Sequence, residues 1–228
     1  MADFLLPYRH IMVITYYGVS CFKIQSGDTV LAIDPFGKES GLTPPRFQTD
    51  VALITHAHEN HSNFDSLASK GGDTEVFKIN SPGEYEIHGI QIHGVSSAHD
   101  ASGGLERGKN TVYIITWEDI RIVHLGDYGE DKLRDDIHEA IGTPDILFVP
   151  VGGGDTIDAE TAAKLVNQIE PRIVIPMHYK THGFKNKIDG VDVFLKEMGE
   201  KSEPEERLTI KKSALPTDTQ KVIVLRTP

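Results

Sequence analysis

Thr55-His56-Ala57-His58-Glu59-Asn60-His61 follows directly on the apolar run Val51-Ala52-Leu53-Ile54, and this histidine-rich segment is the strongest indication of the fold in the sequence. A short, fully apolar run is typical of a strand buried on both faces, so these histidines stand in a loop at the end of a buried strand. His56 and His58 are two apart and point the same way in extended backbone, so they can bind one ion, while His61 can reach a second. Neutral imidazole is a ligand for zinc, iron and other first-row metals.

The alternative is a solvated loop that happens to contain histidines. Three histidines within six positions after an apolar strand favour a metal site over that alternative. Further candidates end later apolar runs in the same way: His99 follows 95–98, Asp127 follows 124–126, and His178 follows 175–177. A single residue of this kind is more often structural, but the shared position suggests that all three converge on one edge of the sheets.

The remaining pattern is rich in β-structure, with strands and helices alternating in the second half. Two sheets packed face to face with helices outside would bury these runs, which predicts an α+β sandwich and one domain over residues 1–228. We expect strands at Ile11–Tyr17, Cys21–Gln25, Thr29–Ile33, Val51–Ile54, Thr111–Thr116, Ile120–Leu125, Asp145–Val151 and Arg172–Pro176. Two hairpins are expected, one over Tyr85–Val95 that turns at His88-Gly89, and one that pairs Leu208–Lys211 with Lys221–Leu225. Helices are expected from Ser62, the start of a capping box, to about Ser69, and over Asp131–Ile141, Asp158–Ile169 (capped by Asp158) and Val191–Met198.

Composition narrows the class of protein. The chain has 228 residues and a formal net charge of −11, a field that repels phosphate backbones, so a nucleic-acid partner is not expected. The single cysteine, Cys21, cannot form an intramolecular disulfide and is expected to be a small buried residue. No apolar run approaches the roughly 20 residues that span a bilayer, and residues 1–10 do not resemble a signal peptide. We therefore expect a soluble cytoplasmic protein with a small-molecule substrate, and both a monomer and a homo-oligomer stay open.

The motifs together resemble the metallo-β-lactamase superfamily. Residues 55–61 resemble its His-x-His-x-Asp-His signature, and His99, Gly126-Asp127 and Pro176-Met177-His178-Tyr179 fall where its later ligand motifs stand. Residues 17–22, 33–36 and 152–160 resemble one branch, the zinc-dependent hydrolases similar to ascorbate-6-phosphate lactonase. The resemblance implies an αββα sandwich with a metal site at one edge and hydrolysis by metal-activated water. Zinc is the expected ion, one or two per chain, with manganese or iron as alternatives.

The resemblance also implies a ligand for each motif position. His56, His58 and His99 would hold the first metal, and His61, Asp127 and His178 the second, with Asp127 bridging both. Asn60 stands where the family has an aspartate, and an amide is neutral and cannot act as a general base. This substitution predicts a weaker second site and a less well oriented water. For substrate contacts we expect His182 and Lys180, while His124 is predicted to be a packed core residue.

Two functions follow from this pattern. The first is an active hydrolase of a small ester, lactone or phosphoester, and the second is a degenerate member with one or no metal that acts as a binding or scaffold protein. The RNA-processing branch of the superfamily is disfavoured because the chain is short and acidic. An oxygen-reducing diiron site is disfavoured because it needs glutamate where His58 stands.

Overall fold

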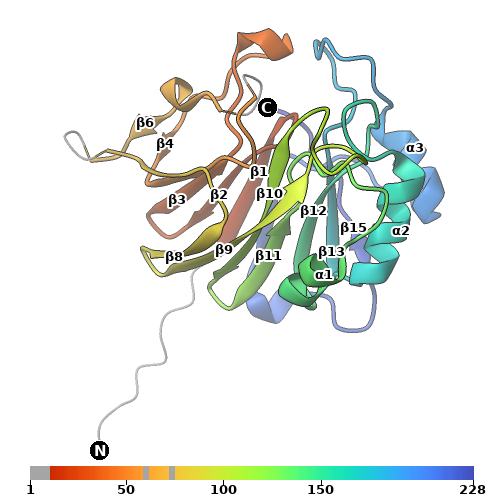
Figure 1. Ribbon diagram of the computed structural model, residues 1–228. Coiled ribbons are helices and arrows are strands. Elements are labelled where there is room, and N and C mark those ends of the chain that lie inside the picture. The colour runs from red at the N-terminus through yellow and green to blue at the C-terminus, as the bar shows by residue number, and fades with distance from the viewer. Residues whose placement is uncertain (1–10, 59–61, 72–74) are drawn as a thin grey trace, which may run out of the picture.

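Two β-sheets packed face to face form the body of the protein in the computed structural model, which describes residues 11–58, 62–71 and 75–228 (Figure 1). The first sheet has six strands in the order β14-β1-β2-β3-β5-β7. They are β1 (Met12–Gly18), β2 (Cys21–Ser26), β3 (Thr29–Ile33), β5 (Val51–Leu53), β7 (Phe77–Ile79) and β14 (Leu208–Ile210). β1, β2 and β3 form an antiparallel meander, whereas β3, β5 and β7 pair in parallel.

The second sheet has seven strands in the order β15-β13-β12-β11-β10-β9-β8. They are β8 (Gly83–Ile87), β9 (Ile90–Ala98), β10 (Lys109–Trp117), β11 (Ile120–His124), β12 (Ile146–Pro150), β13 (Ile173–Met177) and β15 (Lys221–Val222). The predicted β8–β9 hairpin is confirmed, and His88 and Gly89 both have positive φ at its turn (51° and 75°). Every residue of β12 and β13 is buried, as expected for parallel strands covered on both faces.

Three α-helices in the described part of the chain lie on the side of the seven-stranded sheet: α1 (Asp135–Ile141), α2 (Ala159–Ile169) and α3 (Val191–Met198) (Figure 1). α2 is amphipathic, and the Asp158 carboxylate caps it by accepting the Thr161 N–H at 2.9 Å, as predicted. α1 begins at Asp135 rather than at Asp131, because Arg134 has extended backbone with ψ 147° and serves as the N-cap residue.

The core lies between the two sheets. Phe22 of β2 stacks on Phe148 of β12 with ring centroids 4.1 Å apart and planes within 9°, and both rings are fully buried. Truncating either ring to alanine would cost about 3–5 kcal/mol, because both transfer energy and packing are lost. This contact fixes the distance between the sheets, and therefore the separation of the loops at their ends.

The predicted helix from Ser62 to about Ser69 is wrong. That segment holds only the 3₁₀ turn Phe64–Ser66 (η2), followed by β6 (Ala68–Ser69), which pairs in parallel with β4 (Gln48–Thr49). The Ser62 hydroxyl, expected to cap a helix, instead donates to the carbonyl of His58 at 2.9 Å. Without that cap, the backbone hydrogen bonds of β4–β6 stabilise an extended segment.

The predicted hairpin in the tail is also wrong. β14 pairs antiparallel with Met12–Ile14 of β1, whereas β15 pairs in parallel with Ile173–Val174 of β13, so the two segments extend different sheets. The 3₁₀ turn Lys212–Ala214 (η3) lies between them. A two-stranded hairpin is marginal on its own, whereas pairing with an existing edge buries Leu208 and Ile210 against the core.

The outer face of the six-stranded sheet is covered by loop rather than by an α-helix among the described residues. Phe47 packs on Tyr17 of β1 with centroids 5.0 Å apart, and the Lys23 ammonium lies 5.6 Å from the centre of the same ring. The 3₁₀ turn Lys38–Ser40 (η1) belongs to the same connection. None of the helices in the described part of the chain has the length and apolar character to cross a membrane.

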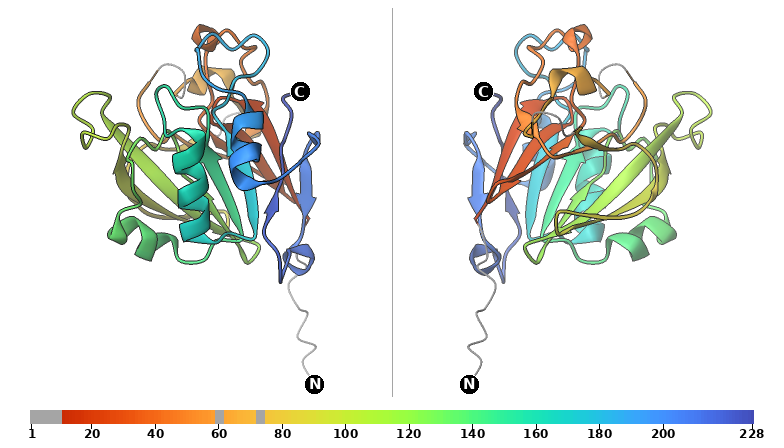
Figure 2. Two further views of the ribbon diagram at one scale, coloured as in Figure 1. Left: turned by 90° about the vertical axis from the view of Figure 1, so that its right-hand side faces the viewer. Right: turned by 90° about the vertical axis from the view of Figure 1, so that its left-hand side faces the viewer.

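Strand direction brings the predicted site residues to one edge. β11, β12 and β13 are parallel, and β9 runs in the same direction because both it and β11 pair antiparallel with β10. The carboxyl ends of these four strands therefore meet at one edge, where ligands bind in open α/β sheets. The loops after β12 and β13 gather at one end of the molecule with the η1 turn (Figure 2).

Candidate metal centre

Three imidazoles meet at this edge from segments far apart in the sequence. The ligating nitrogens of His56, His58 and His99 all lie within 4.8 Å of one another. The ring centroid of His56 lies 4.7 Å from that of His58 and 4.8 Å from that of His99. His56 and His99 are buried and His58 is exposed, so the cluster has two fixed members and one open to solvent.

Asp127 lies at the centre of a larger group. Its Oδ2 is 3.7 Å from Nε2 of His56, 3.4 Å from Nε2 of His99 and 3.3 Å from Nε2 of His178. Tetrahedral Zn–N bonds of about 2.1 Å place neighbouring ligand atoms about 3.4 Å apart, so these separations fit ligands that share a cation. All four residues are at most 6% exposed, and a buried carboxylate among imidazoles is the donor set that such an ion requires.

The loop that carries Asp127 is held by its own backbone and by two polar side chains. The Ser20 hydroxyl donates to Asp127 Oδ1 at 2.8 Å, which leaves Oδ2 facing the histidines, and the Asp127 N–H donates to Asn110 Oδ1 at 3.1 Å. Gly126 has φ 61°, and a Cβ there would lie 2.3 Å from Asn110 Oδ1 and 2.8 Å from Thr55 Cβ. Only glycine therefore allows this approach.

A buried carboxylate sets the tautomer of His56. The Thr55 hydroxyl lies 2.7 Å from Asp34 Oδ2 and 2.9 Å from His56 Nδ1. An ionised carboxylate only accepts, so the single hydroxyl proton of Thr55 is donated to Asp34, and Thr55 Oγ1 accepts from Nδ1–H. With the proton on Nδ1, the lone pair of His56 is on Nε2, the atom that faces Asp127.

The loops of His99 and His178 are equally constrained. The His178 N–H donates to the carbonyl of Val19 at 2.7 Å, and His178 has φ 51°, which is uncommon outside glycine. Gly129 approaches the His99 loop so closely that a Cβ would lie 2.3 Å from the carbonyl carbon of His99. The positions of both candidate ligands are therefore set by backbone contacts.

The family assignment agrees with this geometry. The sequence profile described as "Beta-lactamase superfamily domain" matches residues 13–178, which is most of the chain and includes all five of these side chains. The chain belongs to the metallo-β-lactamase superfamily. A UPF0173 metal-dependent hydrolase from Thermoplasma acidophilum is 30% identical over 188 residues, which cover 74% of this chain and 83% of that protein.

Solved structures of the metallo-β-lactamase superfamily share the fold. A protein from Thermotoga maritima assigned as a Zn-dependent hydrolase of this superfamily matches with a TM-score of 0.73 and 30% identity, over 94% of this chain and 98% of that one. The metallo hydrolase Igni18 from Ignicoccus hospitalis matches with a TM-score of 0.63 and 22% identity, over 88% and 99% of the two chains. The second likeness concerns the fold alone. The predicted sandwich is thus confirmed.

Three residues of the 55–61 motif, Glu59, Asn60 and His61, lie outside the described residues. His61 is predicted to be a second-site ligand, and Asn60 stands where the superfamily has an aspartate. Their roles stay predictions.

The predicted substrate residues are His182 and Lys180, both in the segment after His178. His182 is exposed, and the Lys180 ammonium donates to the carbonyls of Phe184 and Asn186, holding the loop after β13. Neither lines the cavity of about 170 Å³ formed by His58, His99, Asp127 and His178 together with Arg107, Asp155 and Asn186. These last three residues are absent from the sequence prediction. Arg107 belongs to the glycine-rich stretch 101–109, and that composition was the signal that could have pointed to it.

His124 is buried, as predicted, and it also supports the site. Its Nε2 lies 3.0 Å from the carbonyl of Ser20, and its Nδ1 accepts the Gly126 N–H at 3.0 Å. It therefore ties together the two segments that hold Asp127. Cys21 is fully buried, and burial raises the pKa of its thiol, which agrees with a structural role.

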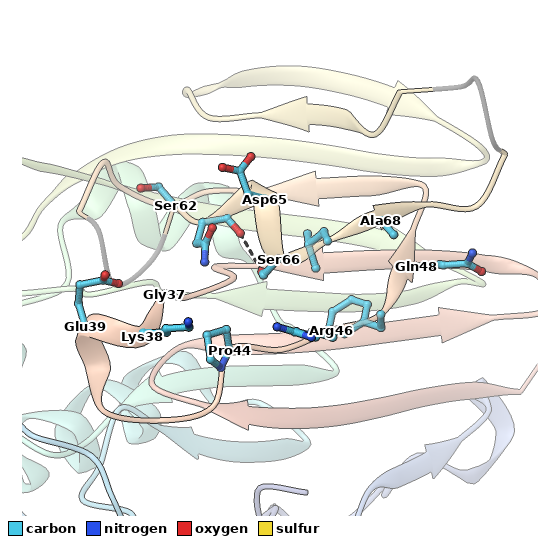
Figure 3. Close-up of a pocket in the computed structure, with 13 residues that line it drawn as sticks. Gly37, Lys38, Glu39, Pro44, Arg46, Gln48, Ser62, Asp65, Ser66 and Ala68 are labelled. Carbon is cyan, nitrogen blue, oxygen red and sulfur yellow. Dashed lines mark hydrogen bonds between the residues drawn. The ribbon is translucent and has the colours of Figure 1, made fainter.

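A larger groove of about 860 Å³ lies between residues 37–48 and 62–68 (Figure 3). Lys38 and Arg46 extend toward one another in it, and Glu39 and Asp65 line it as well. Cations and acids balance in this groove, so its lining does not select the charge of a ligand. None of the five metal-centre side chains contributes to it.

Proposed function

We propose that the protein is a metal-dependent hydrolase of a small ester, lactone or phosphoester. The observation that carries this proposal is the position of Asp127 Oδ2, within 3.7 Å of the Nε2 atoms of three buried histidines. Such a cluster of buried donors is costly to the fold unless a cation shares it. The names of the Thermoplasma acidophilum and Thermotoga maritima relatives support the same class of reaction.

In this proposal His56, His58 and His99 would hold the first metal, and His61, Asp127 and His178 would hold the second, with Asp127 shared by both. Zinc is the proposed metal, with manganese or iron as alternatives. When bound, zinc supplies Lewis acidity and lowers the pKa of a water toward about 7.

The protein's own groups orient this chemistry. Thr55 keeps the proton of His56 on Nδ1, and the Ser20 hydroxyl donates to Asp127 Oδ1. These contacts fix the orientation in which His56 Nε2 and Asp127 Oδ2 would meet an ion. The cavity walls exclude most solvent, because His99, Asp127 and His178 are each 2% exposed. His58 is the exposed side chain of the cluster and marks the side from which substrate enters.

Asn60 supplies no carboxylate, so we propose that the first metal site is stronger than the second. The resemblance to lactonases of ascorbate 6-phosphate makes a sugar lactone phosphate one substrate to assay. We also propose that residues 1–228 form one domain, since a single apolar core contains residues of both sheets.

Metal analysis beside hydrolysis tests the proposal. The wild type, Asp127→Asn, Asn60→Asp and the control Asp50→Asn are purified with added zinc, and metal content and turnover of p-nitrophenyl acetate and bis(p-nitrophenyl) phosphate are measured. Asp50 is a suitable control because it accepts the Val30 N–H at 2.7 Å and does not line the metal cavity. We expect Asp127→Asn to lose metal and turnover, Asp50→Asn to keep both, and Asn60→Asp to gain metal and activity.

A wild type that holds no metal and hydrolyses neither compound would favour the binding or scaffold function instead. Retention of full metal content by Asp127→Asn would contradict the proposed ligand set.

A further inference from the structure

A second pocket, of about 510 Å³, opens beside the metal centre. Its walls are the 55–58 segment with His56 and His58, the turn 80–82, Ser96, and the stretch 107–111. The described side chains that line it include two cations, Arg107 and Lys109, and no carboxylate. The protein has a net charge of −11, so a pocket whose lysine, arginine and carboxylate lining consists of cations favours an anionic ligand.

The loop that presents Arg107 is pre-organised. The carboxylate of Asp100, next to His99, accepts the backbone N–H groups of Ser102, Gly104, Glu106 and Arg107 at 2.8–3.1 Å. The His99 N–H also donates to the carbonyl of Gly108 at 3.1 Å, so Arg107 is positioned relative to a metal-centre histidine.

Arg107 reaches both cavities. It lines the 510 Å³ pocket and also the 170 Å³ metal cavity that contains His58 and Asp127. Its guanidinium donates to the carbonyl of Gly154 at 3.0 Å and pairs with Asp155 at 3.0 Å, and the side chain is 39% exposed. Asp155 is 50% exposed, so the pair is in contact with solvent and is weakly held.

We propose that this pocket binds an oxyanion group of the substrate, a phosphate or a carboxylate, with Arg107 as the residue that determines specificity. The inference rests on the proposed hydrolase function and names its substrate class. Asp155 holds the guanidinium when the pocket is free, and the incoming oxyanion replaces it. The planar fork of arginine binds two oxygens of a phosphate or carboxylate at once, so Arg107 fixes the orientation of the substrate against the metal centre.

Lys109 adds charge rather than geometry. Its ammonium donates to the carbonyl of Gly103 at 3.0 Å, and Lys109 lines the pocket. Together the two cations hold a doubly charged group better than a singly charged one, so phosphate is the stronger expected ligand.

Calorimetric titration with inorganic phosphate, and separately with acetate, tests the inference. The full-length protein is titrated at low ionic strength, first as purified and then after chelation, because phosphate can also bind a metal directly. The variants are Arg107→Gln, Arg107→Lys and Asp155→Asn, with Arg172→Gln as the matched control. Arg172 is also paired to an aspartate and is 41% exposed, but it precedes β13 at the opposite end from His178.

We expect Arg107→Gln to weaken phosphate binding about tenfold or more, and Arg107→Lys to weaken it less. Asp155→Asn removes the competing acid and is expected to tighten binding about two- to fivefold. Arg172→Gln should match the wild type. The anion that binds with the higher affinity, phosphate or acetate, identifies the class of oxyanion.

The inference is overturned if neither anion binds, if Arg107→Gln binds as tightly as Arg172→Gln, or if Asp155→Asn binds more weakly. Circular dichroism confirms that each variant is folded. Metal content and turnover are measured on the same preparations, so the results distinguish the two proposals. If phosphate binds through Arg107 but the protein binds no metal, only the hydrolase proposal is contradicted.

Discussion

Replacing Thr55 by valine removes the hydroxyl that connects Asp34 to His56. Valine has nearly the same shape, so the change deletes polar contacts and leaves little cavity. Asp34 is fully buried and retains the Thr55 N–H at 2.8 Å, but it loses the hydroxyl at 2.7 Å, and His56 Nδ1 loses an acceptor at 2.9 Å. A lost hydrogen bond to a buried charged group costs about 1.5–3 kcal/mol, which we expect as the drop in unfolding free energy.

The same change should weaken metal binding more specifically. A partner that fixes the tautomer and orientation of a ligating histidine is worth about 10- to 100-fold in metal affinity. At about 1.4 kcal/mol per tenfold, that corresponds to about 1.4–2.8 kcal/mol. Zinc affinity is measured by competition with a chromophoric chelator. Stability is measured by urea unfolding of the chelated protein, because bound metal would itself add stability.

Thr49→Val is the matched control. The Thr49 hydroxyl is buried and lies 2.9 Å from the carbonyl oxygen of Val30 and 2.8 Å from that of Val51, so its single proton is shared between these two acceptors, and Thr49 lines neither pocket beside the metal centre. Its loss should lower stability by about 1 kcal/mol and leave zinc affinity unchanged. If Thr55→Val binds zinc as tightly as the wild type, or if Thr49→Val weakens zinc equally, the argument that Thr55 fixes His56 is refuted.

Three further changes probe other parts of the site and fold. Ser20→Ala removes the donor to Asp127 Oδ1 and should lower zinc affinity about tenfold in the same chelator assay; an unchanged affinity would show that Asp127 is oriented without it. Gly126→Ala places a Cβ 2.3 Å from the side-chain amide oxygen of Asn110 and should lower the free energy of unfolding in urea by about 2 kcal/mol or more. The control Gly199→Ala, where φ is also positive but the space is open, should lower it by about 1 kcal/mol. Equal losses in the two variants would contradict the steric argument. Asp158→Ala should cost about 1 kcal/mol at pH 7. Hydrogen bonds from Thr161 lower the pKa of Asp158, so this stabilisation is present above the unfolded pKa of about 3.9 and is lost as the pH falls through the lower folded pKa; a difference that persists at pH 2 would contradict it.

Local sequence was sufficient where neighbouring residues decide the structure. α3 begins and ends where the apolar spacing predicts, and Asp158 caps α2 as its position predicts. The predictions failed where a distant partner competes. Ser62 was expected to cap a helix, but its hydroxyl binds the carbonyl of His58, and the segment after it pairs with β4. In the tail, the sequence predicts that β14 and β15 pair with each other, but β14 pairs with β1 at the edge of one sheet and β15 with β13 at the edge of the other.

For the candidate site, histidine spacing and the apolar runs before it are local properties, so they predict which side chains could be ligands and that these stand at strand ends. The position of Asp127 Oδ2 among three imidazoles has no local signal, since that distance depends on how the strands are ordered and how the two sheets pack. The supporting groups Asp34, Ser20 and Arg107 were likewise not assigned roles from the sequence. Their partners are 21 residues away for Asp34, 107 for Ser20 and 47 for Arg107, and one chain gives no local signal of such contacts.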